Sequence, residues 1–436
     1  MQNLSKIANL PRHLISDGYD EALDVIANIA SEKGLTFKLH SYPSGYDCGT
    51  WIIPEKWTLI RAQVKDAMGN IIIDSDNDPL ACMSYSCPFD GVVTNDELKK
   101  HLYTCSYQPE ATPFIFKYYK RDWGLCVPQS LKDGLKDEHY HVSIQTVFSE
   151  GYLKVGEIIV EGEVSESFVV ASHLCHPYMV NDGPIGTFPT MDILQRLKAD
   201  GAYYTYRQLI VPENIGSAAW LSSNQNLIPK LRGGLFVEMI GTDLPLRLHR
   251  SFRGNTFLDK MFEKVVLEHS ETAVIDDFVY ANDERQFNGP GVDIPMLGLN
   301  RSWMSRNQTE SSAFSHYHTN FDTIDNIHQD NFFEAIKILE HLIFSFERYA
   351  VKPKPLFIGE PFLHRFNAHI DCFDSVDDKQ LLEKLSKSNL VMDILFKCGH
   401  GLTIFEIGND LNESPDTIKS VVNRFVRLGL LSLLPI

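Results

Sequence analysis

Apolar residues near the start of the chain recur at the spacing of one helix face. Ala22, Leu23, Ile26, Ile29 and Ala30 form a single stripe, and Gly34 follows as a stop signal. This pattern predicts an amphipathic helix over residues 16–34. Residues 42–120 have short β-branched runs, turn signals and little helical periodicity, which predicts a small β-rich unit.

From about residue 138 the pattern changes to strands that alternate with helices. Two alternating runs at 141–151 and 152–164 predict a β-hairpin, and the apolar run at 167–171 predicts a strand with both faces buried. The pattern then predicts, in order, a helix at 187–200, a strand at 207–212, a helix at 216–224, a strand at 233–241 and a helix at 257–269. This alternation is typical of an α/β domain whose mixed, mostly parallel sheet has helices on both faces.

The C-terminal part has a different organisation. Residues 348–362 contain three prolines and little periodicity, which predicts a linker. Helical patterns follow at 381–399, 403–411 and 414–428, the last with Ser414 as N-cap and Pro415 at its first position, and 430–434 can form a short strand. We therefore expect a winged helix-turn-helix domain at 355–436, a β-rich insert at 42–120, and one α/β domain built from 1–41 and 121–350.

Length and composition narrow the class of protein. A chain of 436 residues is too long for one typical core, and its net charge of -17 disfavours nucleic acid or an anionic membrane as the main partner. The sequence shows neither a signal peptide pattern nor a membrane-spanning apolar run, and its eight scattered cysteines are typical of reduced thiols. We expect a cytoplasmic protein without a membrane partner, and the insert is a candidate contact for a homo-oligomer.

Polar side chains gather where predicted strands end. They are His173, His176 and Asp182 after the strand at 167–171, Glu213 and Glu238 after the next two strands, and His318 with Asp322 in a later loop. Carboxyl ends of parallel strands share one sheet edge, and imidazole nitrogens and carboxylate oxygens are zinc ligands, so a metal site is predicted. Taken singly, Glu213 could cap a helix, Glu238 could pair with an arginine, and His318 with Asp322 could hold a turn.

The order of these segments resembles the zinc aminopeptidases of the two-metal, co-catalytic type. The matching segments are "SHLCHP" followed by Asn181-Asp182, "PENIGS" at 212–217, "VEMIG" at 237–241 and "HYHTNFDT" at 316–323, while "ANDERQF" at 281–287 resembles a substrate-side segment. With its insert and C-terminal winged helix, nearly the whole chain resembles a bacterial aminopeptidase-like family.

This resemblance implies a role for each residue. Asp182 would bridge or anchor one or two zinc ions, Glu238 would ligate in place of the usual Asp, and His318 would ligate while Asp322 orients it. Glu213 would be the general base. Either His173 or His176, or both, would ligate. Candidates for binding the substrate are Asp283 and Glu284 for an ammonium, and Arg285 and Arg301 for a carboxylate.

Two departures from the family pattern bear on the metal count. Cys175 stands where the peptidases have an Asp that orients the first histidine, and Asn214 replaces the second acid of a Glu pair. Since an amide is a poor zinc ligand, one of two metal positions could be weak, or a single ion could bind.

Three functions fit these observations. The leading hypothesis is a zinc-dependent aminopeptidase-like hydrolase acting on a peptide or aminoacyl conjugate. The second is a pseudo-peptidase that binds a metal or ligand without catalysis. The third is a transcriptional regulator that uses the winged helix, but residues 355–436 carry eight Lys/Arg against eleven Asp/Glu, a poor balance for binding DNA.

Overall fold

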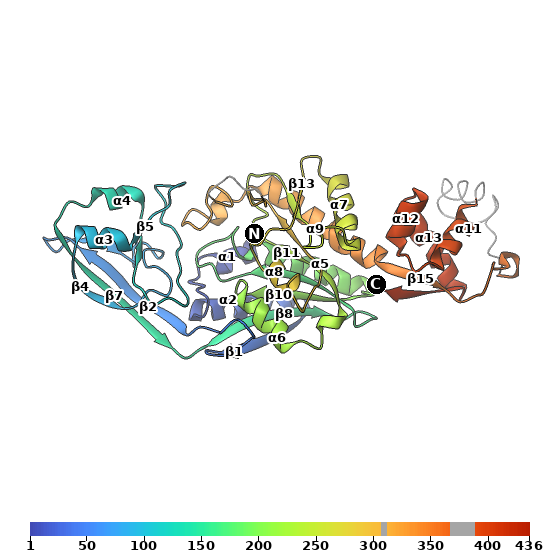
Figure 1. Cartoon of the computed structure of the whole chain (residues 1–436), viewed down its shortest axis with the longest axis horizontal. Coiled ribbons are helices and arrows are strands. Elements are labelled where there is room, and N and C mark those ends of the chain that lie inside the picture. The colour runs from blue at the N-terminus through green and yellow to red at the C-terminus, as the bar shows by residue number, and fades with distance from the viewer. Residues whose placement is uncertain (307–311, 367–388) are drawn as a thin grey trace. The chain divides into compact units, whose positions relative to one another are not determined.

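The computed structural model describes residues 1–306, 312–366 and 389–436 (Figure 1). These residues divide into two compact units. The first contains Met1–Gly201 and Thr205–Leu339, and the second contains Ala202–Tyr204 and Glu340–Ile436. None of the helices in the described ranges is both long and apolar enough to cross a membrane.

The first unit is built on a mixed sheet, to which the described residues contribute eight strands. Their spatial order is β1 (Thr36–Pro43), β8 (Tyr152–Val160), β10 (Thr205–Val211), β9 (Ser167–His173), β11 (Leu231–Val237), β14 (Met296–Asn300), β12 (Arg247–His249) and β13 (Val274–Asp276). The central strands β10, β9, β11 and β14 are parallel to one another. The pairs β1–β8, β8–β10 and β12–β14 are antiparallel, and β12 pairs parallel with β13. The predicted mixed, mostly parallel sheet is confirmed.

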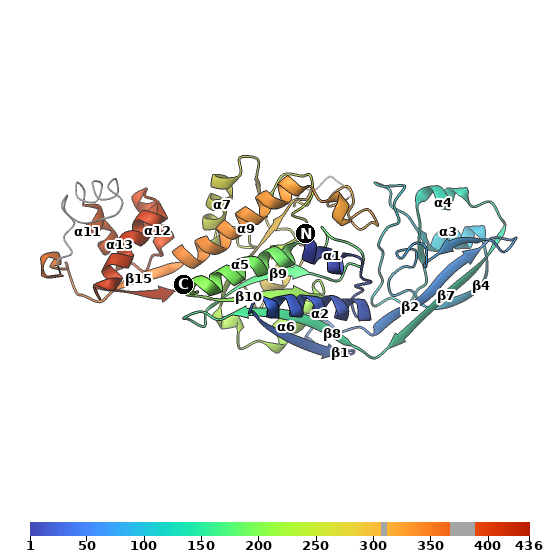
Figure 2. The same ribbon diagram turned by 180° about the vertical axis from the view of Figure 1, so that it is seen from behind.

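Helices cover both faces of this sheet. Figure 2 shows three helices in front of the sheet: α2 (Asp17–Glu32), α5 (Thr187–Asp200) and the start of α9 (Gln329–Tyr349). Figure 1, seen from the other side, shows α6 (Ile215–Ser223) and α8 (Glu284–Phe287) in front of it. The unit also contains α1 (Gln2–Ala8) and α7 (Phe257–His269). The helices predicted at 16–34, 187–200, 216–224 and 257–269 are all present.

Side chains fix where two of these helices begin. Ser16 Oγ accepts a hydrogen bond from the backbone N–H of Tyr19 at the start of α2. At α7, Thr256 and Asp259 form a reciprocal capping box. Each cap satisfies backbone donors that have no partner within the helix.

A second sheet in the same unit joins β3 (Ile71–Asp74), β2 (Lys56–Lys65), β7 (His139–Ser149) and β4 (Phe89–Thr94). The predicted hairpin is therefore wrong: β7 pairs with β2 and β4, and β8 pairs with β1 and β10. The alternation of apolar and polar residues shows that each strand has one buried face but does not identify the strand with which it pairs.

The predicted insert of 42–120 stays a prediction, and β7 lies beyond its end. Short elements complete this region: α3 (Asn95–His101), β5 (Leu102–Tyr103), β6 (Leu125–Cys126) and α4 (Gln129–Gly134).

The second unit contains α11 (Leu390–Cys398), α12 (Ile404–Leu411), α13 (Pro415–Arg427), β15 (Val351–Pro355) and β16 (Leu431–Pro435). Its β15 lies within the predicted linker and pairs antiparallel with β16, so that expectation is wrong. Proline is tolerated in such an edge strand because the N–H groups that point away from the partner strand need not donate a hydrogen bond to it. Ser414 caps α13 as predicted. The helix predicted at 381–399 falls partly outside the described residues, and the winged-helix assignment stays a prediction.

Candidate metal centre

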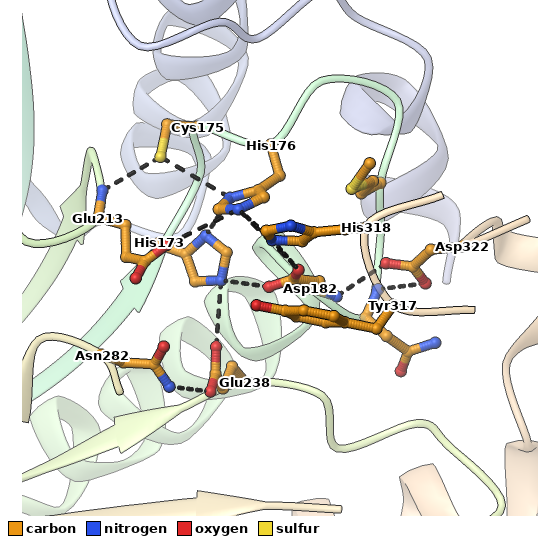
Figure 3. Close-up of polar contacts among 12 residues, drawn as sticks. His173, Cys175, His176, Asp182, Glu213, Glu238, Asn282, Tyr317, His318 and Asp322 are labelled. Atoms are coloured by element: carbon orange, nitrogen blue, oxygen red, sulfur yellow. Dashed lines mark hydrogen bonds and ion pairs between the residues drawn. The ribbon is translucent and has the colours of Figure 1, made fainter. Parts of the chain in front are cut away.

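Three neighbouring parallel strands bring the candidate ligands to one edge of the main sheet. His173 is the last residue of β9, Glu213 follows β10 by two residues, and Glu238 directly follows β11. Parallel strands end on the same side, so these side chains converge as the sequence predicts. Figure 3 shows them around Asp182, with His318 arriving from a distant loop.

Asp182 Oδ1 faces the first of two candidate ligand groups. His173 Nε2 lies 3.2 Å from Asp182 Oδ1 and 3.2 Å from Glu238 Oε2. All three side chains are buried. The other Glu238 oxygen accepts a hydrogen bond from Asn282, which fixes the orientation of this carboxylate. Together they form a compact set of one nitrogen and two carboxylates.

Asp182 Oδ2 faces the second group. His318 Nε2 lies 3.0 Å from it and His176 Nε2 lies 3.9 Å from it, while the two imidazole nitrogens are 3.1 Å apart. Within the part of the chain that the structure describes, this buried Oδ2 has no hydrogen bond. Besides the two imidazoles, a cation bound in front of this oxygen would offset the cost of burying it.

The two groups share Asp182, as a bridging ligand would. Imidazole nitrogens and carboxylate oxygens are the donors that zinc takes in catalytic sites. The donor set therefore fits one or two divalent ions. His173 and His176 lie in different groups of the two that contain Asp182, and a third possible group joins both histidines with Cys175.

Burial and close charges shift the acid–base properties of this cluster. The pKa of Asp182 is well below its usual value because His176 and His318 outweigh its burial. Burial raises the pKa of Glu238 to about 7 and that of Glu213 to about 8. Burial lowers the pKa of His176 well below its usual value. Carboxylates held this close together without a cation favour protonation, and a bound cation would reverse that preference.

Strained backbone accompanies the cluster. Asn214, Met239 and His318 have φ values of 59°, 49° and 51°, in the left-handed region that residues other than glycine seldom adopt. Each lies in the cluster or directly after one of its residues. Such strain persists only where the surrounding structure holds it, and it concentrates at functional sites.

Glu213 stands beside the second group at its more open side. Its Oε2 lies 3.7 Å from His176 Nε2, and Oε1 accepts a hydrogen bond of 2.9 Å from Asn214 Nδ2. Its backbone N–H donates to Cys175 Sγ over 3.1 Å. The Glu213 side chain is 22% exposed, so it can reach both the ligand cluster and a substrate.

The predicted substrate-binding residues have different surroundings. Asp283 and Glu284 are buried, and Asp283 accepts a hydrogen bond from the backbone of Asn214. Arg285 donates from Nε to Asn214 Oδ1 over 2.6 Å. Arg301 is buried and bonded to Leu244 O and Glu334. The structure thus brings Arg285 next to the cluster, whereas the contacts of Arg301 are those of a buried structural ion pair.

Asp322 holds the backbone around Asp182. Its carboxylate accepts hydrogen bonds from the backbone N–H groups of Val180, Asn181 and Asp182 over 3.1, 3.0 and 2.8 Å. Among the described residues no hydrogen bond joins Asp322 to the His318 imidazole, so the expectation that Asp322 orients His318 stays a prediction. Asp322 positions the shared ligand.

Arg12 is a supporting residue that the sequence did not suggest. Its fully buried guanidinium donates to the carbonyls of Leu174, His176 and Met179 over 3.0, 2.8 and 2.6 Å, and also to Ile7 and Ala8. It thereby fixes the loop that carries His176. No signal in the sequence links Arg12 to a segment more than 160 residues away.

A segment from residues 107–116 packs against the second group. Phe114 lies edge-on to the rings of His176 and His318, with centroids 5.2 and 5.6 Å away. Its backbone N–H donates to His318 O over 2.7 Å, and Tyr107 donates to Tyr317 O. This segment places aromatic surface on one side of the cluster.

The chain resembles known proteins in sequence and in fold. The chain is 32% identical, over 77% of its own length and 75% of the relative's, to a Clostridium acetobutylicum protein named for polysaccharide biosynthesis and an aminopeptidase-like domain. A crystal structure from C. acetobutylicum, named as a peptidase, matches with a TM-score of 0.80 and 26% identity, over 99% of this chain and 95% of that chain.

More distant structures share the fold. The zinc aminopeptidase BSAP from Bacillus subtilis matches with a TM-score of 0.58 and 12% identity, over 79% of this chain and 94% of that chain. The profile of the family described as "Domain of unknown function (DUF4910)" matches residues 2–349. The chain therefore belongs to this bacterial aminopeptidase-like family.

Proposed function

We propose that this protein is a zinc-dependent, aminopeptidase-like hydrolase that cleaves an amide bond in a peptide or aminoacyl conjugate. The observation that carries the proposal is the placement of His173 and His318 on the two oxygens of Asp182, with Glu238 beside His173. Glu213 stands 3.7 Å from the His176 imidazole that completes the set. These residues combine a metal-ligand set with a separate carboxylate.

In this proposal His173, Asp182 and Glu238 would hold one ion, and His176, Asp182 and His318 would hold a second where two are bound. A zinc ion there would supply a Lewis acid that polarises the amide carbonyl and acidifies the attacking water. Glu213 accepts a proton from that water and passes it to the nitrogen of the departing amine. Asn214 holds the Glu213 carboxylate in place, and Phe114 keeps bulk water from the histidines.

The test is amide hydrolysis by the purified full chain, loaded with zinc and supplied with aminoacyl amides, dipeptides and N-acyl amino acids. We expect hydrolysis that a chelator abolishes and that zinc restores. The Glu213→Gln variant should keep its zinc and lose about 10²- to 10⁴-fold in kcat. Glu21→Gln, on an exposed position of α2, is the matched control and should behave as the wild type.

Two results would contradict the proposal. One is undiminished turnover by Glu213→Gln. The other is a zinc-loaded wild type that is inert on every amide, which would favour the pseudo-peptidase alternative.

A further inference from the structure

Three cavities share two side chains, and one of them reaches Glu213. Their volumes are about 330, 630 and 720 Å³, and Trp51 and Arg285 line all three. Glu213, Asn214 and Cys175 line the smallest. A substrate bound there would have one end at the proposed general base and the rest between Trp51 and Arg285.

Arg285 gives these cavities a positive charge. Its Nε donates to the Asn214 side chain, and because that partner is a neutral amide, the charge of the guanidinium is not compensated by it. Of the described residues that line the three cavities, Arg285 is the one lysine or arginine. The two acids among them are Glu213 and Asp293, and Asp293 is bound by Arg253.

Among the described residues, the acids that line these cavities are Glu213 and Asp293, and they do not form an anionic pocket for a substrate ammonium. The nearby acids Asp283 and Glu284 are 0% and 5% exposed and line none of the three cavities. Asn214 presents an amide instead of a carboxylate. The cavity space beside the proposed base, Glu213, is therefore lined by the Arg285 cation and by aromatic rings. This lining disfavours the binding of a positively charged substrate group.

Aromatic rings form one wall of the cavity of about 630 Å³. Phe252, Phe278 and Tyr280 pack edge to face, with centroids 5.6 Å apart for the first pair and 5.1 Å for the second. Phe252 and Tyr280 are 54% and 62% exposed. Exposed rings gathered at a cavity suit a flat or apolar group that covers them from water.

We infer that the substrate of the proposed hydrolase carries a carboxylate next to the scissile amide, and that Arg285 binds this carboxylate. The apolar or aromatic side chain of the same residue occupies the cavity lined by Phe252, Phe278 and Tyr280. This inference rests on the proposed function and names its substrate class. The class is N-acyl amino acids, including peptides cleaved at their last residue.

The reaction balances with water alone. Water adds to the acyl carbon, the C–N bond breaks, and the acyl group leaves as a carboxylic acid. One water proton passes through Glu213 to the nitrogen, which leaves as the amine of a free amino acid. The carboxylate bound by Arg285 is unchanged throughout.

A matched pair of substrates tests this recognition. Hippuryl-phenylalanine has the carboxylate, hippuryl-phenylalaninamide lacks it, and phenylalanine p-nitroanilide offers an ammonium instead. On the zinc-loaded full chain we expect kcat/KM for the acid to exceed that for its amide by about tenfold or more, as for hydrogen bonds to a charged group. Arg285→Gln should remove this preference mainly through KM, while Arg285→Lys should retain part of it.

The matched control is Arg61→Gln, which removes an arginine bound to Asp74 in the second sheet and should leave the preference unchanged. Preferred cleavage of the p-nitroanilide would overturn the inference and still support the hydrolase. Equal rates for acid and amide, or a preference that persists in Arg285→Gln, would also overturn it.

Binding measured without turnover separates this inference from the proposed function. Calorimetry with Glu213→Gln should show tighter binding of hippuryl-phenylalanine than of its amide, and the double variant with Arg285→Gln should lose the difference. If no amide is hydrolysed but this difference is present, the proposed function fails and the carboxylate site stands. Equal binding of acid and amide would overturn the site.

Discussion

The carboxylate of Asp322 holds the backbone of Asp182: its Oδ2 accepts the N–H of Asp182 over 2.8 Å. Two further N–H groups of the same loop bond to Asp322. The loop that carries the shared ligand is thus fixed by a residue 140 positions later. Asp182 can then present one oxygen to His173 and the other to His318.

Replacing Asp322 should weaken metal binding without touching a ligand. Asp322→Asn removes the charge that holds three N–H groups, so we expect zinc affinity to fall by about 10- to 100-fold, as for other residues that orient metal ligands. Competition with a chelator measures this. Asp325→Asn, on an exposed carboxylate three residues away, is the control. Unchanged affinity in Asp322→Asn would refute the positioning role.

Arg12 should contribute strongly to stability. Arg12→Met leaves carbonyls of two segments without their donor, among them Leu174 O, His176 O and Met179 O. Since each unbonded buried group costs about 1–3 kcal/mol, the free energy of unfolding should fall by at least about 3 kcal/mol. Urea unfolding measures it, with the partly exposed Arg61→Met as control. A loss within about 0.5 kcal/mol would contradict this role.

His13 should make stability depend on pH. It is buried against Trp57 and Ser84, and burial, followed by the charge of Arg12, lowers the pKa of His13 to about 3. In the unfolded chain the imidazole titrates near 6.5. The unfolded state therefore binds the extra proton at intermediate pH. The contribution of His13 is complete above pH 6.5 and falls as pH drops toward 3, by about 1.4 kcal/mol per pH unit.

The measurement is urea unfolding of the wild type and His13→Gln at about pH 7.5 and about pH 5.5. Between them the wild type should lose about 1.4 kcal/mol more than the variant. Equal losses would show that His13 is not the titrating group.

Gly186 lies where α5 approaches the end of β11. A Cβ there would stand 2.5 Å from Val237 O, one residue before Glu238. Gly186→Ala should therefore lower the free energy of unfolding by about 1–3 kcal/mol and weaken zinc binding, because the backbone must move. Gly134→Ala, where nothing lies within 4 Å of the added atom, should be nearly neutral. Thermal unfolding of both variants tests the difference.

Sequence reasoning predicted the main sheet well because its strands carry local signals. The run at 167–171 and the helix at 187–200 correspond to β9 and to α5. Which strand another strand pairs with does not depend on local sequence. The predictions of a β7–β8 hairpin and of a linker at β15 are wrong for this reason. The alternation of apolar and polar residues and the proline content characterise a single strand and do not identify the strand with which it pairs.

The same distinction holds for the candidate site. Residues at strand ends, such as His173 and Glu238, could be placed together from topology alone. Arg12 and Asn282 could not, because their partners are chosen by the folded chain. The separation of His173 and His176 into different groups also required coordinates. Zinc, the cytoplasmic location and the homo-oligomer stay predictions.

The most direct test of the account is the zinc content of the purified full chain, measured by mass spectrometry after loading with zinc and removal of free metal. The wild type should retain one or two zinc ions per chain, and Asp182→Ala should retain none, because both ligand groups depend on that carboxylate. A wild type that retains no zinc, or an Asp182→Ala variant that retains as much as the wild type, would contradict the central claim.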